Sequence, residues 1–473
     1  MPIHYPEAEA AIRARGVEWE FEPSLDRMQE LVDLLGGPQR SAAVIHVTGT
    51  NGKTSTATMI DALLRARGLR TGRYTSPHLT TMRERICVDG EPLSEERFVA
   101  AYADVLPYVQ MVDAAAPPSL SFFEVLTAMA FAVFADAPVD VAILEVGMGG
   151  IWDATNVADG SVAVVTPIAV DHIRYLGGTI QAIATEKSGI IKPGAVAVVA
   201  QQPLEAARVL MQRAAERGAS VAREGIEFGV LNRAVAVGGQ QLVLQGVRGV
   251  YEDLFLPLFG AHQASNAVCA LAAVEAFAGV PAAGGESPVT DNPRGETGGA
   301  LDVELVRESF AQMTSPGRLE TLRHSPTVLV DVAHNPAGMA ATVAAVEESF
   351  AFSALVGVAA ISADKDAPGI LGELEPALSQ IVVTRNSSVR SMEVSALAEV
   401  AGEVFGPDRV HTAARLDDAI DLAVRLADEE VSSGPGQFLP GSAGVLITGS
   451  VVTVGDARVL LTSANAAGPG KGG

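Results

Sequence analysis

Short apolar runs alternate with stretches of helical spacing along most of the 473 residues. Apolar runs at 43–47, 139–145 and 162–167 predict buried strands, and the stretch at 53–67 predicts a helix that Gly68 closes. Such alternation of strand and helix is typical of a parallel α/β sheet.

Residues 227–256 change character, because short Val and Leu stretches are broken by glycines, and this predicts antiparallel hairpins attached to the first domain. A Gly- and Pro-rich stretch at 282–300 is predicted to be a flexible loop, and the Gly- and Ala-rich tail at 463–473 is predicted to be disordered. Between them we expect helices at 302–313, 336–350, 367–377, 393–404 and 415–428, strands at 327–332, 354–360, 380–384 and 444–448, and a final short helix.

The pattern predicts two α/β domains: a parallel-sheet domain at 1–314 and a smaller Rossmann-like domain at 315–462. Apolar residues make up 48% of the chain, but no run reaches the roughly 18 apolar residues of a membrane span. The first seven residues lack a basic stretch followed by an apolar one, so we expect no secretory signal.

Charge and cysteine content narrow the possible partners. The 33 basic and 56 acidic residues give a net charge of −23, which disfavours nucleic acid because phosphate backbones need a clustered basic surface. Two cysteines, Cys87 and Cys269, make no disulfide framework. We therefore expect a cytoplasmic protein that acts on small molecules without a membrane or nucleic-acid partner. A monomer is also expected, although charge and cysteine content do not determine it.

A candidate phosphate loop joins the first predicted strand to the helix that follows it. Its residues are Gly49, Thr50, Asn51, Gly52, Lys53, Thr54 and Ser55. Glycines let backbone N–H groups approach an anion, and the helix N-terminus adds its positive dipole end. Lys53 can reach the β- and γ-phosphates of ATP, and Thr54 or Ser55 can offer a hydroxyl to Mg²⁺. The alternative is a chance Gly-Lys-Thr at a helix start, since Val47 stands where the common loop has glycine.

Two more polar residues follow predicted strands. Glu145 ends the strand at 139–145, at the edge where ligands collect in an open α/β sheet, and a carboxylate there suits Mg²⁺. His172 follows the strand at 162–167 and can reach the same edge. The alternatives are a capping or ion-paired Glu145 and a structural His172, since imidazole is an unusual ligand for magnesium.

The short loop form resembles that of the Mur ligase superfamily, in which ATP phosphorylates a carboxylate and an amine then attacks the acyl phosphate. Four further segments, at 74–79, 144–150, 171–177 and 186–190, are similar in order and spacing to motifs of the bifunctional dihydrofolate synthase and folylpolyglutamate synthase family. The resemblance implies a P-loop-containing parallel-sheet ATPase domain followed by the smaller Rossmann-like domain.

The resemblance also implies the ligand set. It places Thr54, Ser76, Glu145, His172 and Lys187 around magnesium, with two ions expected. Lys187 would be carbamylated and bridge the metals, and a monovalent cation is allowed. The segment around Ser121, Phe122 and Phe123, together with Asp153, would bind the pterin. An aromatic pair opening a helix is otherwise more often core.

In the remaining motifs, the resemblance implies that Asn266 lies against adenine, where the alternative is a simple N-cap. Arg318 would bind the γ-phosphate, Asp331 the ribose and His334 the base. The implied catalytic residues are Lys53, Glu145, His172, Lys187 and Arg318.

The leading hypothesis is therefore an ATP-dependent ligase that adds L-glutamate to dihydropteroate or to reduced folates through an acyl phosphate. The alternative is a peptidoglycan-precursor amino-acid ligase, which Thr54 favours. Only 48 residues precede Gly49, too few for the additional domain expected of such ligases. A third hypothesis is an ATP-binding scaffold without catalysis. Thr54, Ile151, Arg174 and Val389 depart from the family pattern and leave substrate details open.

Overall fold

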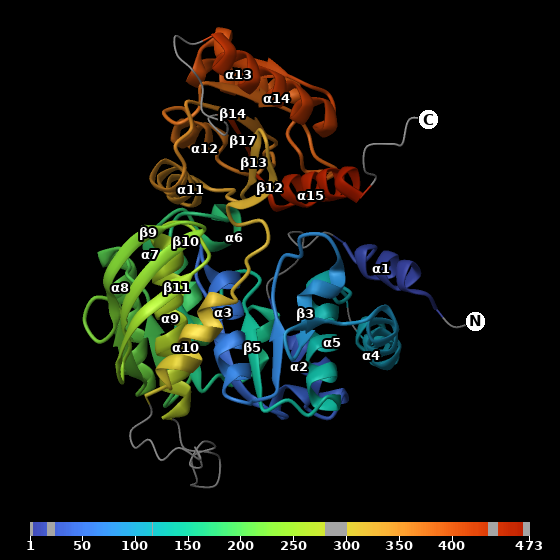
Figure 1. The fold of residues 1–473 in the computed structure, drawn as a ribbon. Helices are drawn as coiled ribbons and strands as arrows, with labels where there is room; N and C mark the ends of the chain where they lie inside the picture. The colour runs from blue at the N-terminus through green and yellow to red at the C-terminus, as the bar shows by residue number, and fades with distance from the viewer. Residues whose placement is uncertain (1–2, 17–23, 116, 280–299, 434–442, 467–473) are drawn as a thin grey trace. The chain divides into compact units, whose positions relative to one another are not determined.

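The computed structural model describes residues 3–16, 24–115, 117–279, 300–433 and 443–466. It divides into two compact units (Figure 1). Unit 1 comprises Met1–Ala234, Gln241–Leu256 and Gln263–Met313, and unit 2 comprises Val235–Gln240, Pro257–His262 and Thr314–Gly473. Two short segments that the sequence pattern assigned to the first domain therefore cluster with the second unit. The loop predicted at 282–300 lies almost wholly outside the described residues.

An eight-stranded sheet organises unit 1, in the order β4-β3-β2-β5-β1-β6-β7-β8. Its strands are β1 Ala43–Thr48, β2 Thr71–Tyr74, β3 Ile86–Val88, β4 Glu91–Pro92, β5 Val141–Glu145, β6 Val162–Val165, β7 Val196–Val199 and β8 Ser220–Arg223. All neighbours from β2 to β8 pair in parallel, and only β3 and β4 are antiparallel. The predicted parallel sheet and its three buried strands are confirmed.

Alternate residues of these strands face opposite layers of the unit. Val44 and Leu144 pack with Phe98 and Phe131 in a core that also holds residues of α1, α2, α4 and α5. In the parallel register, Ala163 pairs with His46 and points to that same face, where it packs with residues of α7 and α8. The helices of unit 1 are α1 Tyr5–Arg13, α2 Asp26–Leu34, α3 Lys53–Ala66, α4 Glu95–Ala115, α5 Phe122–Asp136, α6 Ile173–Leu176, α7 Ile180–Lys187, α8 Leu204–Arg217, α9 Ala261–Ala278 and α10 Val303–Ala311.

The antiparallel hairpins predicted at 227–256 are confirmed as a three-stranded sheet in the order β11-β10-β9. Its strands are β9 Gly229–Ala236, β10 Gly239–Gln245 and β11 Val250–Leu256.

Unit 2 is built on a six-stranded sheet in the order β12-β13-β17-β14-β15-β16. The strands are β12 Glu320–His324, β13 Thr327–Val330, β14 Ala354–Ala359, β15 Gln380–Val383, β16 Val410–Thr412 and β17 Ala443–Thr448. Its helices are α11 Pro336–Ser349, α12 Ala367–Leu374, α13 Val394–Phe405, α14 Leu416–Ser433 and α15 Val451–Ala466. Only β12 is antiparallel to its neighbour, so the predicted second α/β domain is confirmed in its fold class.

Two expectations for unit 2 were wrong. The last helix was expected to be short, but α15 runs for 16 residues and continues to Ala466, past the start of the tail predicted at 463–473. The strand β16 was missed because three residues on the sheet edge, only partly buried, leave little apolar signal. Residues 467–473 lie outside the described part of the chain.

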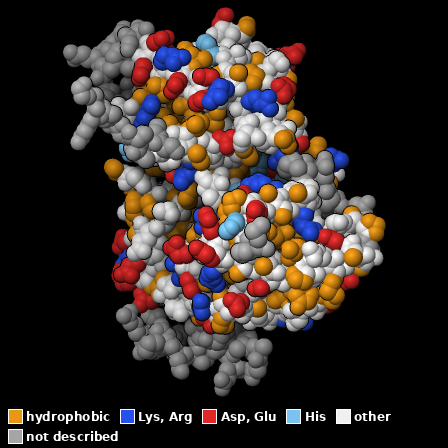
Figure 2. All heavy atoms as spheres, turned by 90° about the vertical axis from the view of Figure 1, so that its right-hand side faces the viewer, with side chains coloured by type: hydrophobic (Ala, Val, Ile, Leu, Met, Phe, Trp, Pro, Cys, Tyr) orange, Lys and Arg blue, Asp and Glu red, His pale blue; other side chains and the backbone are white. Residues whose placement is uncertain are grey.

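Acidic and basic side chains lie among one another on the face of the molecule shown in Figure 2. Within the described residues, no helix combines the length and the apolar character needed to cross a membrane.

Candidate active site

The phosphate loop connects β1 to α3 through two glycines that no other residue could replace without strain. Gly49 has φ 145° and Gly52 has φ 86°. A Cβ atom on Gly49 would lie 1.9 Å from Thr166 Oγ1, and one on Gly52 would lie 2.4 Å from Asn266 Oδ1. The loop is therefore shaped by its own backbone and by close neighbours in unit 1.

Hydrogen bonds fix the loop further. The Thr50 N–H donates to Pro167 O at 2.9 Å, and Thr50 Oγ1 lies 3.0 Å from Ala169 O. Lys53 Nζ donates to Thr50 O at 3.0 Å. Asn266 is buried, and its amide Nδ2 donates to Gln263 Oε1 at 3.1 Å. The close approach of Asn266 to Gly52 brings a predicted adenine-binding residue beside the predicted phosphate loop.

Glu145 is buried, with 1% of its surface exposed, where β5 ends. Thr54 Oγ1 lies 3.0 Å from each of its carboxylate oxygens. The Ser76 N–H donates to Glu145 Oε2 at 3.2 Å. The structure thus brings together three of the five residues predicted to surround magnesium. Thr54 and Glu145 meet through oxygen atoms of the kind that Mg²⁺ prefers, and Ser76 meets Glu145 through its backbone N–H.

Among the described residues, no group of three or more His, Cys, Asp and Glu side chains is arranged to hold a metal ion. The oxygen atoms of Thr54 and Glu145 suit Mg²⁺ bound with a nucleotide, because that ion takes one or two protein carboxylates and completes its shell with water and phosphate oxygens. That Thr54, Ser76, Glu145, His172 and Lys187 would hold the metal stays a prediction.

His172 caps the short helix α6 with left-handed backbone, at φ 51°. Its N–H donates to Asp171 Oδ1 at 2.8 Å, and its Nε2 lies 3.9 Å from Asp171 Oδ2. The geometry therefore ties His172 to Asp171, and its metal role stays a prediction.

Lys187 ends α7 and is 4% exposed. Its Nζ donates to Gly49 O at 2.7 Å, so the amine faces the phosphate loop. Burial, together with the charge of Lys53, lowers the pKa of Lys187 to about 7, against the opposing effects of Asp171, Asp153 and Glu186.

The residues predicted to bind the pterin lie at helix starts. Ser121 caps α5, and its Oγ accepts from the Glu124 N–H at 3.3 Å. Phe122 is buried beneath the Arg85 guanidinium, 5.0 Å from its ring centre, whereas Phe123 is only partly buried and lies 5.7 Å from the ring of Tyr74. Stacking on a pterin stays a prediction.

Asp153 is fully engaged within the protein. Its carboxylate accepts from the Met148 N–H and the Thr155 N–H, each at 3.0 Å, and burial raises its pKa. The side chain therefore fixes the loop that follows Glu145, and any contact with substrate would add to that structural task.

In unit 2, Arg318 stands in a turn formed by residues 315–320, called the Arg318 turn below. Gly317 has φ 72° and Leu319 has φ 44°. Asp331, at the end of β13 and 4% exposed, accepts from the Leu319 N–H and the Ala333 N–H, each at 2.9 Å. Its carboxylate also accepts from Thr342 Oγ1 at 2.8 Å. Asp331 therefore holds the Arg318 turn against β13, and its predicted contact with ribose stays a prediction.

Two residues that support this turn, Glu320 and Arg458, could not be recognised from the sequence pattern. Glu320 accepts from the Gly317 N–H at 2.8 Å and is paired with Arg458 of α15. The two are 138 positions apart, so no local pattern could have revealed the pair.

His334 Nδ1 lies 2.9 Å from Val332 O, which sets the orientation of its ring.

Comparison with known proteins places these motifs in a family. Residues 47–274 match the Mur ligase middle domain, and residues 317–450 match the glutamate ligase domain of Mur ligases. The dihydrofolate synthase/folylpolyglutamate synthase of Mycobacterium tuberculosis is 51% identical over 471 residues, covering 96% of this chain and 93% of that protein. The enzyme of the same name from Bacillus subtilis is 30% identical, covering 96% and 98%.

Solved structures agree. The M. tuberculosis folylpolyglutamate synthase complexed with ADP superposes with a TM-score of 0.89 at 51% identity, covering 97% of this chain and 98% of that one. Escherichia coli FolC in complex with DHPP and ADP gives 0.80 at 28%, covering 98% and 99%.

The fold and the phosphate-loop site thus define a ligase of the Mur type. The coverage and sequence identity of the matched relatives identify the family more closely. The chain belongs to the dihydrofolate synthase/folylpolyglutamate synthase family.

Proposed function

We propose that this protein forms an amide between L-glutamate and the carboxylate of dihydropteroate or of a reduced folate, at the expense of ATP. The observation that carries the proposal is that the phosphate loop contacts a buried carboxylate. Thr54 Oγ1 lies 3.0 Å from each carboxylate oxygen of Glu145. Relatives of matching length that are named for this activity support it.

The reaction proceeds in two steps. A carboxylate oxygen of the acceptor attacks the γ-phosphorus of ATP, and ADP leaves. The amino group of glutamate then attacks the acyl phosphate, phosphate leaves, and the amine loses a proton. Bound Mg²⁺ would supply neutralisation of the phosphate charge.

The chain's own groups position and stabilise these reactants. The backbone of residues 49–52 and Lys53 hold the phosphates, and Glu145, Thr54 and Ser76 orient the metal-binding side of the site. Arg318 acts on the charge that develops during phosphoryl transfer, because its planar fork matches phosphate oxygens. His172 completes the predicted catalytic set. Asn266 is proposed to lie against the adenine, and His334 to pack near the same base.

Lys187 is proposed to act as a carbamate. Its neutral amine adds to CO₂, a C–N bond forms, one proton is released, and an anionic two-oxygen ligand results. Burial and the contact with Gly49 O support a poised, uncharged amine beside the phosphate loop. An ammonium there would instead repel metal ions.

The protein is also proposed to be a cytoplasmic monomer that binds two Mg²⁺ ions and acts on small-molecule substrates. These proposals come from the sequence and from its resemblance to the family.

The test is ADP release by the purified protein with Mg²⁺-ATP. We expect turnover that requires both glutamate and a pteroate or folate acceptor. Turnover with a muramyl-peptide precursor and none with folates would establish the peptidoglycan-ligase alternative. Binding of ATP without turnover on either acceptor would establish the scaffold hypothesis.

A further inference from the structure

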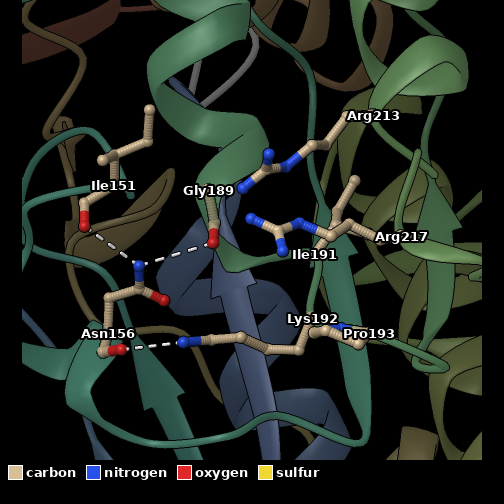
Figure 3. Close-up of a pocket in the computed structure, with 8 residues that line it drawn as sticks. All are labelled: Ile151, Asn156, Gly189, Ile191, Lys192, Pro193, Arg213 and Arg217. Atoms are coloured by element: carbon tan, nitrogen blue, oxygen red, sulfur yellow. Dashed lines mark hydrogen bonds between the residues drawn. The ribbon is translucent and has the colours of Figure 1, made fainter.

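A cavity of about 290 Å³ lies in unit 1 apart from the phosphate loop. Its walls come from the segment around Asn156, the segment from Gly189 to Pro193 and the end of α8 (Figure 3). Lys192 and Pro193 precede β7, whereas the phosphate loop follows β1, and the two strands run parallel through β6. Residues 49–55 of the phosphate loop do not line the cavity, although Gly189 is two positions from Lys187, which contacts that loop.

Three cations line this cavity: Lys192, Arg213 and Arg217. Figure 3 shows both guanidinium groups directed toward Gly189 and Asn156. Lys192 Nζ donates to Asn156 O at 2.9 Å. Burial lowers the pKa of Lys192, Asp159 opposes this shift, and the charges of Arg217 and Arg213 add to it.

Asp159 is the acidic residue that acts most on Lys192. Asp159 lies 3.6 Å from Lys192 Nζ, but its side chain is 87% exposed, so water screens that pair. Glu216 acts on Arg213 only at a distance and accepts a hydrogen bond from Gln212. The helix dipole can explain why a cation lies in the last turn of α8. It cannot explain why polar atoms in the cavity wall are buried without a hydrogen-bond partner in the part of the chain that the structure describes.

Two polar atoms of the residues that line the cavity are buried and have no hydrogen-bond partner among the described residues. They are Arg213 Nε, a donor, and Asn156 Oδ1, an acceptor. The orientation of the Asn156 amide is fixed, because its Nδ2 donates to Ile151 O at 3.0 Å and to Gly189 O at 3.4 Å. An unpaired buried donor and acceptor are each costly, so both point to a ligand that accepts and donates.

We propose that this cavity is a binding site for inorganic phosphate. Its oxygens would accept from Lys192, Arg213 and Arg217, and its hydroxyl would donate to Asn156 Oδ1. Sulfate has the same shape but no hydroxyl at neutral pH, and a phosphomonoester dianion has none either. The chemistry therefore favours free phosphate over both. This binding site does not depend on the proposed ligase activity.

The test is isothermal titration calorimetry of the full chain with inorganic phosphate, with Mg²⁺ and the non-hydrolysable analogue AMPPCP filling the nucleotide site. We expect one phosphate to bind under these conditions. Arg213→Gln should weaken binding about tenfold, as loss of a charge-assisted hydrogen bond typically does, and the double change with Arg217→Gln should weaken it further. Arg208→Gln removes the same charge from an exposed position of α8 outside the cavity and should leave binding unchanged.

Sulfate and phenyl phosphate at pH 7.5 should each bind more weakly than phosphate. Circular dichroism melts of the variants separate lost binding from lost folding. The proposal is overturned by absence of binding at millimolar phosphate, by complete displacement with AMPPCP, or by equal affinity in the Arg213→Gln and Arg217→Gln double variant. Sulfate bound as tightly as phosphate would overturn the role of Asn156 and the assignment to phosphate.

Discussion

The phosphate loop and the Arg318 turn both present a cation to phosphate in the proposed mechanism, but they are held in shape by different means. The phosphate loop is fixed by Gly49 and Gly52, whose missing side chains admit Thr166 and Asn266. The Arg318 turn is fixed by carboxylates, because Asp331 and Glu320 accept from its backbone N–H groups. The shape of a loop that depends on glycines is determined by a few adjacent residues. The shape of a turn held by side chains depends on partners that are distant in the sequence.

The largest effect in the Arg318 turn is expected when the Arg318 guanidinium is removed. Arg318→Ala should lower kcat by about 10²–10³ and change the KM for ATP far less, because the guanidinium acts on charge that develops in the transition state. Steady-state kinetics with ATP as the varied substrate measure both values. A variant with normal kcat and weaker ATP binding would contradict this role.

Lys187→Ala tests whether the side chain that faces the phosphate loop from α7 acts as a carbamate. We expect activity about 10²-fold lower, the size of effect seen on removal of a single stabilising group. Added acetate or propionate should restore part of it, since a free carboxylate can fill the space of the carbamate. The control is the unchanged enzyme, whose activity acetate should not raise. Failure of every short carboxylate to rescue Lys187→Ala would count against the carbamate.

Gly52→Ala tests the glycine-built loop. The new Cβ would lie 2.4 Å from Asn266 Oδ1, so the loop or Asn266 must move, and we expect the KM for ATP to rise about tenfold, equivalent to about 1.4 kcal/mol. Gly68→Ala is the control, because its φ of 82° is similar and no atom lies within 4 Å of the added Cβ. Both variants should lose about 1 kcal/mol of stability in denaturant unfolding from the left-handed backbone. Equal ATP affinity in the two would show that the Asn266 contact does not matter.

Glu320→Gln is expected to have the smallest effect. It weakens the pair with Arg458 and the hydrogen bond to the Gly317 N–H, so the Arg318 turn should loosen and kcat should fall a few-fold, with little change in the KM for ATP. Asp417→Asn removes an exposed partner of Arg415 in the same unit and should leave kcat unchanged. A loss of kcat in Glu320→Gln that also appears when Arg318 is already alanine would argue that Glu320 does not act through Arg318.

The same contrast explains what the sequence could predict. The strand, loop and helix around Gly49–Lys53 were predictable because they are contiguous, and Glu145 was predictable because the carboxyl ends of parallel strands share one edge. The contact of Thr54 with Glu145 follows from that topology. The Glu320–Arg458 pair, the length of α15 and the edge strand β16 were not predictable, since each depends on tertiary partners rather than on local period. The bonds that occupy Asp331 and Asp153 were likewise hidden, because a strand-end or loop carboxylate looks the same in sequence whether it binds ligand or backbone.

The central claim is that the acceptor carboxylate is activated by phosphorylation in the site between residues 49–55 and Glu145. The most direct measurement uses an acceptor whose reacting carboxylate carries ¹⁸O, with unlabelled ATP and glutamate, and follows the released phosphate by mass spectrometry. The account predicts that each phosphate formed carries one ¹⁸O atom, because the bond from the carboxylate oxygen to phosphorus survives when glutamate attacks the carbonyl carbon. Amide formation with phosphate free of label would contradict it.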